Sequence, residues 1–265
     1  MASHPDADLH PVATGPAKSI VDAHQKEEPL KLYSGWFCPF VQRVWSIFEE
    51  KKIPYQYIEN KSQSLLSLNP RGLVPTLQFS DKPLFESTVI CEFLEDAYPE
   101  STPKFLPEDV YLRAKTRLWI EFFSRSLVPA FHRFLQVTRV SNFEDKQLES
   151  ETIDKDLSKE DEDLSSNEEG EEPTLIDFAV APWIVRLWGS DQFKGGLGIP
   201  GEGKGGRDEV VWERLRRWKM ALENRPSIRD TTSEREYYLP IYQRYAEDRA
   251  QSELAKSIRK GQGVV

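Results

Sequence analysis

The stretch that most constrains the fold covers residues 30–45, LKLYSGWFCPFVQRVW. Leu30 and Leu32 alternate with Lys31 and Tyr33, as in a strand. From Phe40 onward the hydrophobic residues recur at helical spacing. Pro39 marks the change, because proline fits the first turn of a helix, where its missing N–H would have no partner. Cys38 therefore takes the N-cap position. The unpaired N–H groups and the positive end of the helix dipole favour its thiolate form, so we expect a nucleophilic cysteine here.

The surrounding sequence predicts an α/β unit over residues 29–98. Residues 69–72, Asn-Pro-Arg-Gly, form a turn signal, and residues 80–82 join two strands in a hairpin candidate. After the first strand and helix, the expected elements are strands at 55–59, 74–79 and 83–85, a helical turn at 64–68 and a helix at 86–97. The order is therefore strand–helix–strand, followed by strand–strand–helix.

Residues 99–108 contain three prolines and predict a linker, after which residues 109–265 form an all-helical domain. A long helical pattern covers residues 110–140, and Pro129 should bend or interrupt it. The sequence Thr174-Leu-Ile-Asp has the spacing of a capping box, at the start of a helix that runs to Trp188. Further helices are expected at 208–223, from about 233, and in a polar tail to 260.

Residues 189–206 form a glycine-rich loop that also contains Lys204. Glycine and lysine together can cradle a phosphate when the loop follows a strand with P-loop spacing. This loop follows a helix and lacks that spacing, so we interpret it as a surface connection.

Most of the negative charge lies in one segment. The 265-residue chain carries a formal charge of −9, and residues 144–172 alone carry −11, so the remainder carries +2. We expect residues 144–172 to be mobile, because they have few apolar side chains to bury. The nearly neutral remainder has no basic cluster with interleaved aromatics, and we therefore expect no nucleic-acid partner.

Composition also bears on the compartment. Two cysteines cannot build a disulfide framework, and their number suits a reducing environment. No apolar run approaches the ~20 residues of a membrane span, and residues 1–28 lack the apolar core of a secretory signal. We predict a cytoplasmic protein without a membrane partner. Residues 1–28 show no periodicity and are expected to form a disordered extension.

Three motifs resemble the glutathione transferases, and the omega class in particular. They are Phe-Cys-Pro-Phe at 37–40, Asn-Pro-Arg-Gly-Leu-Val-Pro at 69–75 and Phe-Glu-Ser at 85–87. The second half is similar more loosely, through Pro182-Trp183, Arg186-Leu187 and Thr232-Ser-Glu234, and residues 144–173 do not match. The resemblance implies an α/β thioredoxin-like N-terminal domain and an all-α C-terminal domain, with glutathione as co-substrate and a homodimer as the assembly.

The resemblance also implies a glutathione site. Pro75 would be a cis residue, which lets Val74 turn its backbone N–H and C=O toward the cysteinyl unit of the ligand, as an added strand would. Ser87 and the free N–H groups of its helix suit the γ-glutamyl carboxylate, and Glu86 can meet the ammonium. The remaining glutathione contacts implied are Phe40 beside the thiol, Lys61 for the glycyl carboxylate, and Leu73.

A thiolate at Cys38 favours disulfide exchange over the activation of glutathione for conjugation. In conjugation the glutathione sulfur would also be a thiolate, and the two thiolates would compete for the same space. Cys38 would attack a glutathionylated or oxidised substrate and form a mixed disulfide. Val41 occupies the position where a dithiol enzyme keeps its resolving cysteine, so external glutathione must regenerate the thiol. The predicted activity is that of a monothiol thioltransferase or dehydroascorbate reductase.

The acceptor is expected to be a small hydrophobic molecule, a disulfide or a quinone. Trp183, Arg186 and Tyr237 are candidates for its pocket, although core aromatics and a buried ion pair explain them nearly as well. Cys91 and His132 are interpreted as packing residues, and no metal site is assigned. Two other functions stay open: a non-catalytic binding protein for hydrophobic small molecules, and a regulatory protein whose acidic insert contacts partners.

Overall fold

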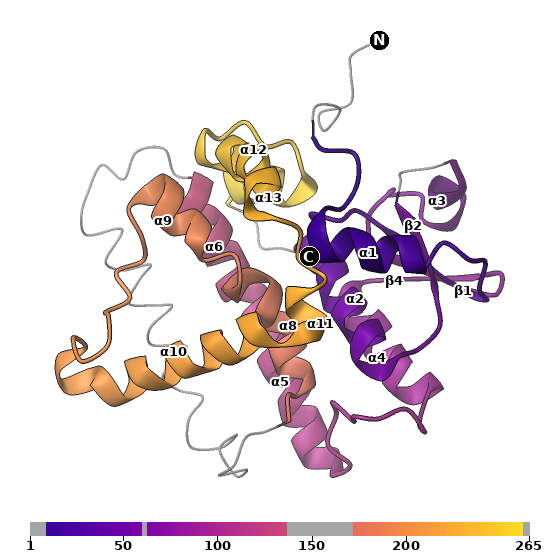
Figure 1. Ribbon diagram of the computed structural model, residues 1–265, viewed down its shortest axis with the longest axis horizontal. Coiled ribbons are helices and arrows are strands. Elements are labelled where there is room, and N and C mark those ends of the chain that lie inside the picture. The colour runs from indigo at the N-terminus through magenta and orange to yellow at the C-terminus, as the bar shows by residue number, and fades with distance from the viewer. Residues whose placement is uncertain (1–8, 60–62, 137–171, 262–265) are drawn as a thin grey trace.

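The computed structural model describes residues 9–59, 63–136 and 172–261 of the chain (Figure 1). Its first half contains a four-stranded sheet with the strand order β2-β1-β3-β4. The strands are β1 (Leu30–Ser34), β2 (Gln56–Glu59), β3 (Thr76–Phe79) and β4 (Lys82–Phe85). β1 runs parallel to β2, whereas the pairs β1–β3 and β3–β4 are antiparallel. The predicted strand–helix–strand, strand–strand–helix order is confirmed.

Three helices follow β1 in this half: α2 (Pro39–Lys51), the short α3 (Gln63–Leu68) and α4 (Ser87–Ala97). α2 packs against α4 and also against two helices of the second half, α8 (Leu175–Ile184) and α11 (Pro226–Arg229). As a result every residue from 41 to 48 is buried, polar ones included. A helix that is buried all round must find partners for its polar side chains inside the protein.

The prediction of a disordered extension over residues 1–28 is wrong from residue 9 onward. Residues 15–23 form helix α1 (Gly15–Ala23), which begins with a proline in its first turn. Ala13, Ala17 and Val21 are buried in the hydrophobic core, at a spacing of four residues. The Thr14 N–H donates to Ser233 Oγ at 3.1 Å, which fixes the segment to the C-terminal half. The buried side chains at helical spacing and this hydrogen bond together hold the segment in place.

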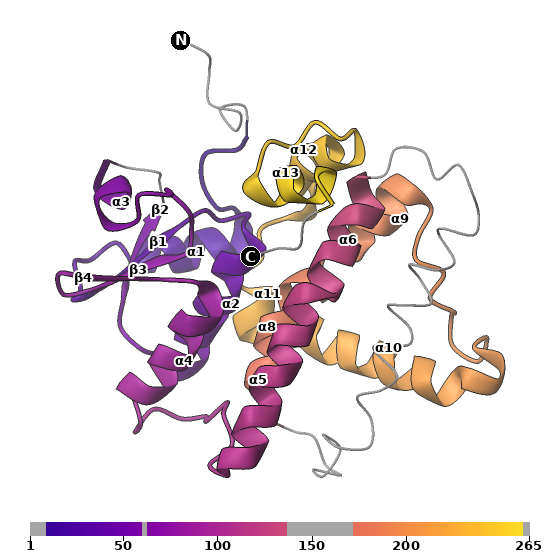
Figure 2. The same ribbon diagram turned by 180° about the vertical axis from the view of Figure 1, so that it is seen from behind.

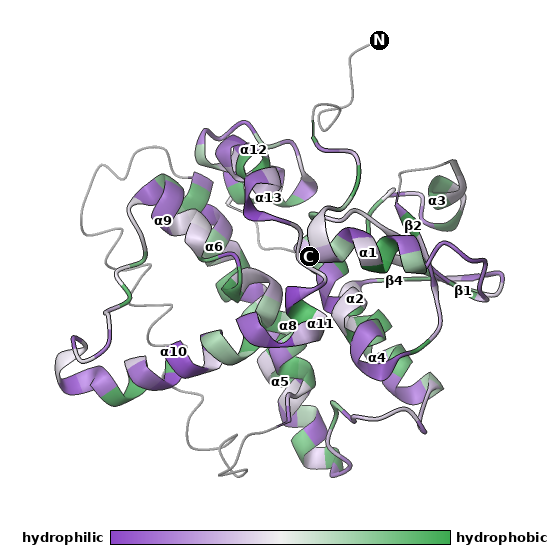
Figure 3. Ribbon diagram, in the orientation of Figure 1, coloured by the Kyte–Doolittle hydropathy of each residue, from purple (hydrophilic) through white to green (hydrophobic). Residues whose placement is uncertain are grey.

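The second half is helical, as predicted (Figure 2). Its helices are α5 (Val110–Arg125), α6 (Leu127–Gln136), α8 (Leu175–Ile184), α9 (Trp188–Lys194), α10 (Glu209–Asn224), α11 (Pro226–Arg229), α12 (Arg235–Ala246) and α13 (Glu253–Arg259), with a 3₁₀ turn at Gly206–Asp208. All of α8 except Asp177 is buried. α10 extends away from the other helices and is largely hydrophilic (Figure 3), with only Leu222 buried.

Three boundaries differ from the prediction. The long helix breaks at Ser126, so that Pro129 falls in the first turn of α6, where its missing N–H costs nothing. The helix with the capping box ends at Ile184 rather than Trp188, and α9 occupies the start of the predicted glycine-rich loop. Apart from Glu172, the acidic segment lies outside the described residues. Within those residues, no helix has the length and hydropathy that crossing a bilayer requires.

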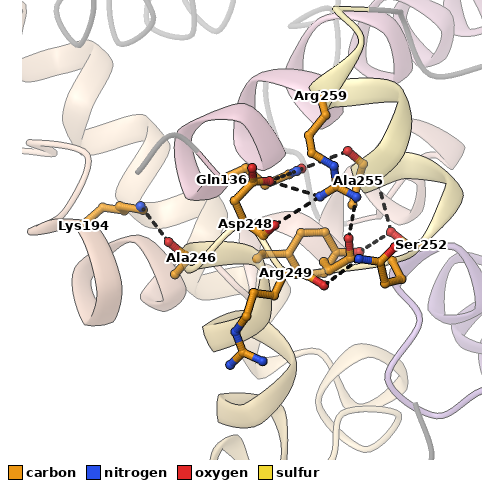
Figure 4. Close-up of polar contacts among 11 residues, drawn as sticks. Gln136, Lys194, Ala246, Asp248, Arg249, Ser252, Ala255 and Arg259 are labelled. Carbon is orange, nitrogen blue, oxygen red and sulfur yellow. Dashed lines mark hydrogen bonds and ion pairs between the residues drawn. The ribbon is translucent and has the colours of Figure 1, made fainter. Parts of the chain in front are cut away.

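The C-terminal segment folds back onto the end of α6 (Figure 4). The Gln136 side-chain amide donates to Asp248 Oδ1 at 3.3 Å and to the Ala255 carbonyl at 3.2 Å. Arg259 donates to the same Asp248 oxygen at 3.0 Å, and Ser252 caps α13 by accepting from the Ala255 N–H. These bonds hold α13 against the end of α6, and Arg71 of the first half lies 2.9 Å from Glu253 of α13.

Candidate functional site

Cys38 is the N-cap residue of α2, as predicted. Its backbone is extended, with φ −77° and ψ 120°, and its carbonyl accepts the Gln42 N–H at 3.1 Å, the first bond of the helix. Its side chain is partly exposed and unconnected to the other cysteine. The sulfur lies 3.8 Å from the carbonyl oxygen of Val74. A thiol at the start of a helix is therefore placed beside the loop that precedes β3.

That loop covers residues 69–75 and ends in the predicted cis peptide bond between Val74 and Pro75. Asn69 stabilises the conformation of this loop. The Asn69 side chain is 3% exposed and donates to the Leu73 carbonyl and to Thr76 Oγ1. The Leu73 carbonyl is thus occupied. In the described part of the chain the Val74 N–H has no hydrogen-bond partner, so it is free to bind a ligand.

Glu86 and Ser87 begin α4 beside this loop. Glu86 is the N-cap and has a φ of +70°, which is strained for a residue with a Cβ and is typical of functional sites. Its carboxylate lies 3.7 Å from Arg71 of the loop. Ser87 is 6% exposed and occupies the first helical turn, next to backbone N–H groups without helical partners. The start of α4 therefore presents backbone N–H groups of the kind that can receive an anion.

Arg43, which no sequence motif singled out, connects α2 to Ser87 at the start of α4. Its side chain is 2% exposed and donates to Ser87 Oγ at 3.3 Å. Its other nitrogens donate to the Ala179 carbonyl at 2.7 Å and to Ser124 Oγ at 3.4 Å. One signal was present in the sequence, because Arg43 is a charged residue within an apolar helical run.

The aromatic side chains beside Arg43 come from both halves of the chain. The Phe40 and Trp183 rings lie 5.0 Å apart in an edge-to-face arrangement, and the Arg43 guanidinium lies over both. Phe40 is partly exposed, which agrees with a position beside the thiol, whereas Trp183 is 1% exposed. Trp183 therefore serves as packing in this structure, and its assignment to an acceptor pocket stays a prediction.

Arg186 and Tyr237 differ in exposure. Arg186 is 1% exposed and donates to Gln42 Oε1, to the Pro182 carbonyl and to the Tyr238 hydroxyl. No carboxylate pairs with it among the described residues, so the buried ion pair considered for it is absent there. Tyr237 is partly exposed and its ring lies 4.5 Å from that of His10. Their role in an acceptor pocket also stays a prediction.

Two other residues considered from the sequence, Cys91 and His132, are buried. Cys91 is 3% exposed on α4, and burial raises the pKa of its thiol to about 12, so it remains protonated and unreactive at neutral pH. His132 is also buried, and burial lowers the pKa of its imidazole to about 3. Lys61 lies outside the described residues. The structure thus brings together Cys38, Val74, Glu86 and Ser87.

Comparisons with known proteins agree with this geometry. The model of the family described as glutathione S-transferase, N-terminal domain, matches residues 37–97. The chain is 32% identical to glutathione S-transferase omega-1 of Mus musculus over 169 residues, which are 61% of this chain and 68% of that protein. It is 32% identical to pyrimidodiazepine synthase of Drosophila melanogaster over 166 residues, 60% of this chain and 65% of that protein.

Among solved structures, the crystal structure of glutathione transferase Omega 3C from Trametes versicolor superposes with a TM-score of 0.74. The two sequences are 37% identical, and the match covers 91% of this chain and 100% of that one.

Proposed function

Because the chain belongs to the glutathione transferase family, in its omega class, we propose that it is a thiol transferase working through a mixed disulfide between Cys38 and glutathione. The observation that carries the proposal is the position of Cys38 at the N-cap of α2, with its sulfur 3.8 Å from the Val74 carbonyl. The helix N-terminus favours the thiolate, and the thiolate is the nucleophile in disulfide exchange.

Glutathione binds across the residues that surround this sulfur. The free Val74 N–H and its carbonyl pair with the cysteinyl unit, in the manner of an added strand. Ser87 and the first N–H groups of α4 receive the γ-glutamyl carboxylate, and Glu86 receives the ammonium. Lys61, which lies outside the described residues, is assigned to the glycyl carboxylate.

The reaction has two exchange steps. The Cys38 thiolate attacks the glutathione sulfur of a glutathionylated substrate, the substrate disulfide breaks, and the substrate leaves as its thiolate. A second glutathione thiolate then attacks the Cys38–glutathione disulfide, which releases oxidised glutathione and restores the Cys38 thiolate. Val41 is buried where a resolving cysteine would stand, so the second thiol comes from solution. Reduction of dehydroascorbate would oxidise two glutathiones in the same way.

Mass spectrometry tests the proposal directly. After incubation with oxidised glutathione, we expect one glutathione adduct on the intact protein, mapped to Cys38, and its removal by excess reduced glutathione. The variant Cys38→Ser should form no adduct and should lose thioltransferase turnover, since serine cannot form a disulfide. Cys91→Ala is the matched control and should behave like wild type. Turnover retained in Cys38→Ser would refute the mechanism.

We also place the protein in the cytoplasm, where glutathione keeps Cys38 reduced, and propose that it forms a homodimer. An exposed apolar face supports the second proposal: Phe85 of β4, Val89 of α4, and Tyr111 and Leu118 of α5. Arg117 and Glu92 join α4 and α5 beside it, with their side chains 2.7 Å apart. Exposed apolar side chains on adjoining elements are typical of an interaction surface.

A further inference from the structure

We propose that Arg43 is a positioning residue for glutathione. It orients the Ser87 hydroxyl toward the γ-glutamyl carboxylate and places a positive charge behind that hydroxyl, near the carboxylate. This inference rests on the proposed glutathione site and extends it to a residue that does not touch the ligand.

The first argument is that Arg43 is a buried cation without a carboxylate. It is 2% exposed, and in the described part of the chain its polar partners are one carbonyl and two hydroxyls. Burying a charge without a counter-charge is unfavourable. The edge-to-face pair of Phe40 and Trp183 recovers part of this through cation–π contact at 5.3 and 4.5 Å. A nearby anionic ligand would supply the missing counter-charge.

The second argument concerns the Ser87 hydroxyl, which has one hydrogen and two lone pairs. The Arg43 guanidinium has only hydrogens to offer, so at 3.3 Å it occupies a lone pair of Ser87 Oγ. The hydroxyl hydrogen must therefore point elsewhere, and no described residue accepts it. It is left to donate into the helix start where the γ-glutamyl carboxylate is placed. Donation from a cation also makes the hydroxyl a stronger donor.

The third argument is that Arg43 is held rigidly. The Ala179 carbonyl, 2.7 Å from Nε, lies on α8, and Ser124 lies on α5, so the second half of the chain fixes the guanidinium plane. Burial lowers the pKa of Arg43 to about 10, which leaves the side chain charged at neutral pH. The charge is thus permanent and aimed at Ser87.

A pair of ligands tests this role by calorimetric titration. One is S-hexylglutathione, and the other is its analogue with 4-aminobutyrate in place of the γ-glutamyl residue, which lacks the carboxylate. We expect Arg43→Met to raise the Kd for S-hexylglutathione at least tenfold, which corresponds to about 1.4 kcal/mol of binding free energy. The Kd for the analogue should stay within about twofold of the wild-type value. Ser87→Ala should show the same selectivity, and the double variant should lose little more than either single one.

Ser124→Ala is the matched control, because it removes another Arg43 partner but not the one at the ligand, and its affinities should equal those of wild type. An equal loss for both ligands in Arg43→Met would show a purely structural role and overturn the inference, as would unchanged binding. If Arg43→Met does not fold, Arg43→Lys replaces it, and the same selective loss is expected in weaker form. If wild type binds neither ligand, the proposed function itself fails.

Discussion

The buried imidazole of His132 makes stability depend on pH. Burial lowers its pKa from 6.5 to about 3 in the folded chain, whereas the unfolded chain titrates at the ordinary value. Above pH 6.5 both states hold a neutral ring and the effect is absent. As the pH falls from 6.5 toward 3, the unfolded state alone takes up the proton, so stability declines by about 1.4 kcal/mol per pH unit.

We expect His132→Asn, which cannot take up this proton, to lose that part of the slope. Its free energy of unfolding relative to wild type should therefore rise as the pH falls from about 6 to about 4, whatever the offset at neutral pH. Urea unfolding of both proteins across this range measures the difference. Parallel curves would show that the imidazole is hydrated or protonated in the folded state.

At the same scale, the sequence predicted the local geometry of three positions in the candidate site. Cys38 beside Pro39, the Val74–Pro75 bond and the start of α4 at Ser87 each depend on a few neighbouring residues, and the structure shows all three. The role of Arg43 could not be predicted, because its partners lie 44, 81 and 136 residues further along the chain. Only the folded chain brings such groups together.

At the scale of helices, one buried ion pair joins α2, α4 and the linker. Lys51 Nζ lies 2.7 Å from Glu95 Oε1, and the two side chains are 0% and 5% exposed. Lys51 also donates to the Ser101 and Pro103 carbonyls, and Glu95 accepts the Phe105 N–H at 3.2 Å. We expect Lys51→Met to destabilise the fold by roughly 3–5 kcal/mol, because Glu95 would remain buried without its cation.

The double variant Lys51→Met with Glu95→Gln should regain a large part of that loss, since glutamine is neutral and its oxygen can still accept the Phe105 N–H. Chemical denaturation of wild type, both single variants and the double variant gives the coupling energy. Additive effects would mean that the two side chains do not interact.

Helices were predicted well where a single strong pattern defined them, as in α2, α4 and α8. The errors have physical causes. α1 was missed because its buried residues are only Ala17 and Val21, too few and too small to give a clear hydrophobic pattern. The break at Ser126 was placed at Pro129, because a proline is tolerated in a first helical turn and does not by itself locate the break.

At the scale of the whole molecule, the site depends on the contact between the two halves. Gln42 of α2 donates to the Ile228 carbonyl and to both Thr231 and Thr232, and it accepts from Arg186. Glu50, near the end of the same helix, accepts two bonds from Arg225. The helix that carries Cys38 is therefore held against the second half both near its start and near its end.

A second copy of the chain would bind at an exposed apolar face of the whole molecule. The apolar face of Phe85, Val89, Tyr111 and Leu118 lies on β4, α4 and α5, and in an isolated chain it would remain in water. Val210 offers a matched control, because it is 77% exposed on α10, against 69% for Leu118. Since burying an unpaired charge in an apolar interface is costly, we expect Leu118→Arg to shift the protein from dimer to monomer.

Val210→Arg should leave the dimer intact, because that side chain lies outside the proposed interface. Light scattering during size-exclusion chromatography at micromolar concentration measures the mass of all three proteins. Cys38 and the loop of residues 69–75 belong to a single chain, so a monomeric Leu118→Arg variant should still form the glutathione adduct. A monomeric wild type, or a Leu118→Arg variant that stays dimeric, would contradict the assignment of this face.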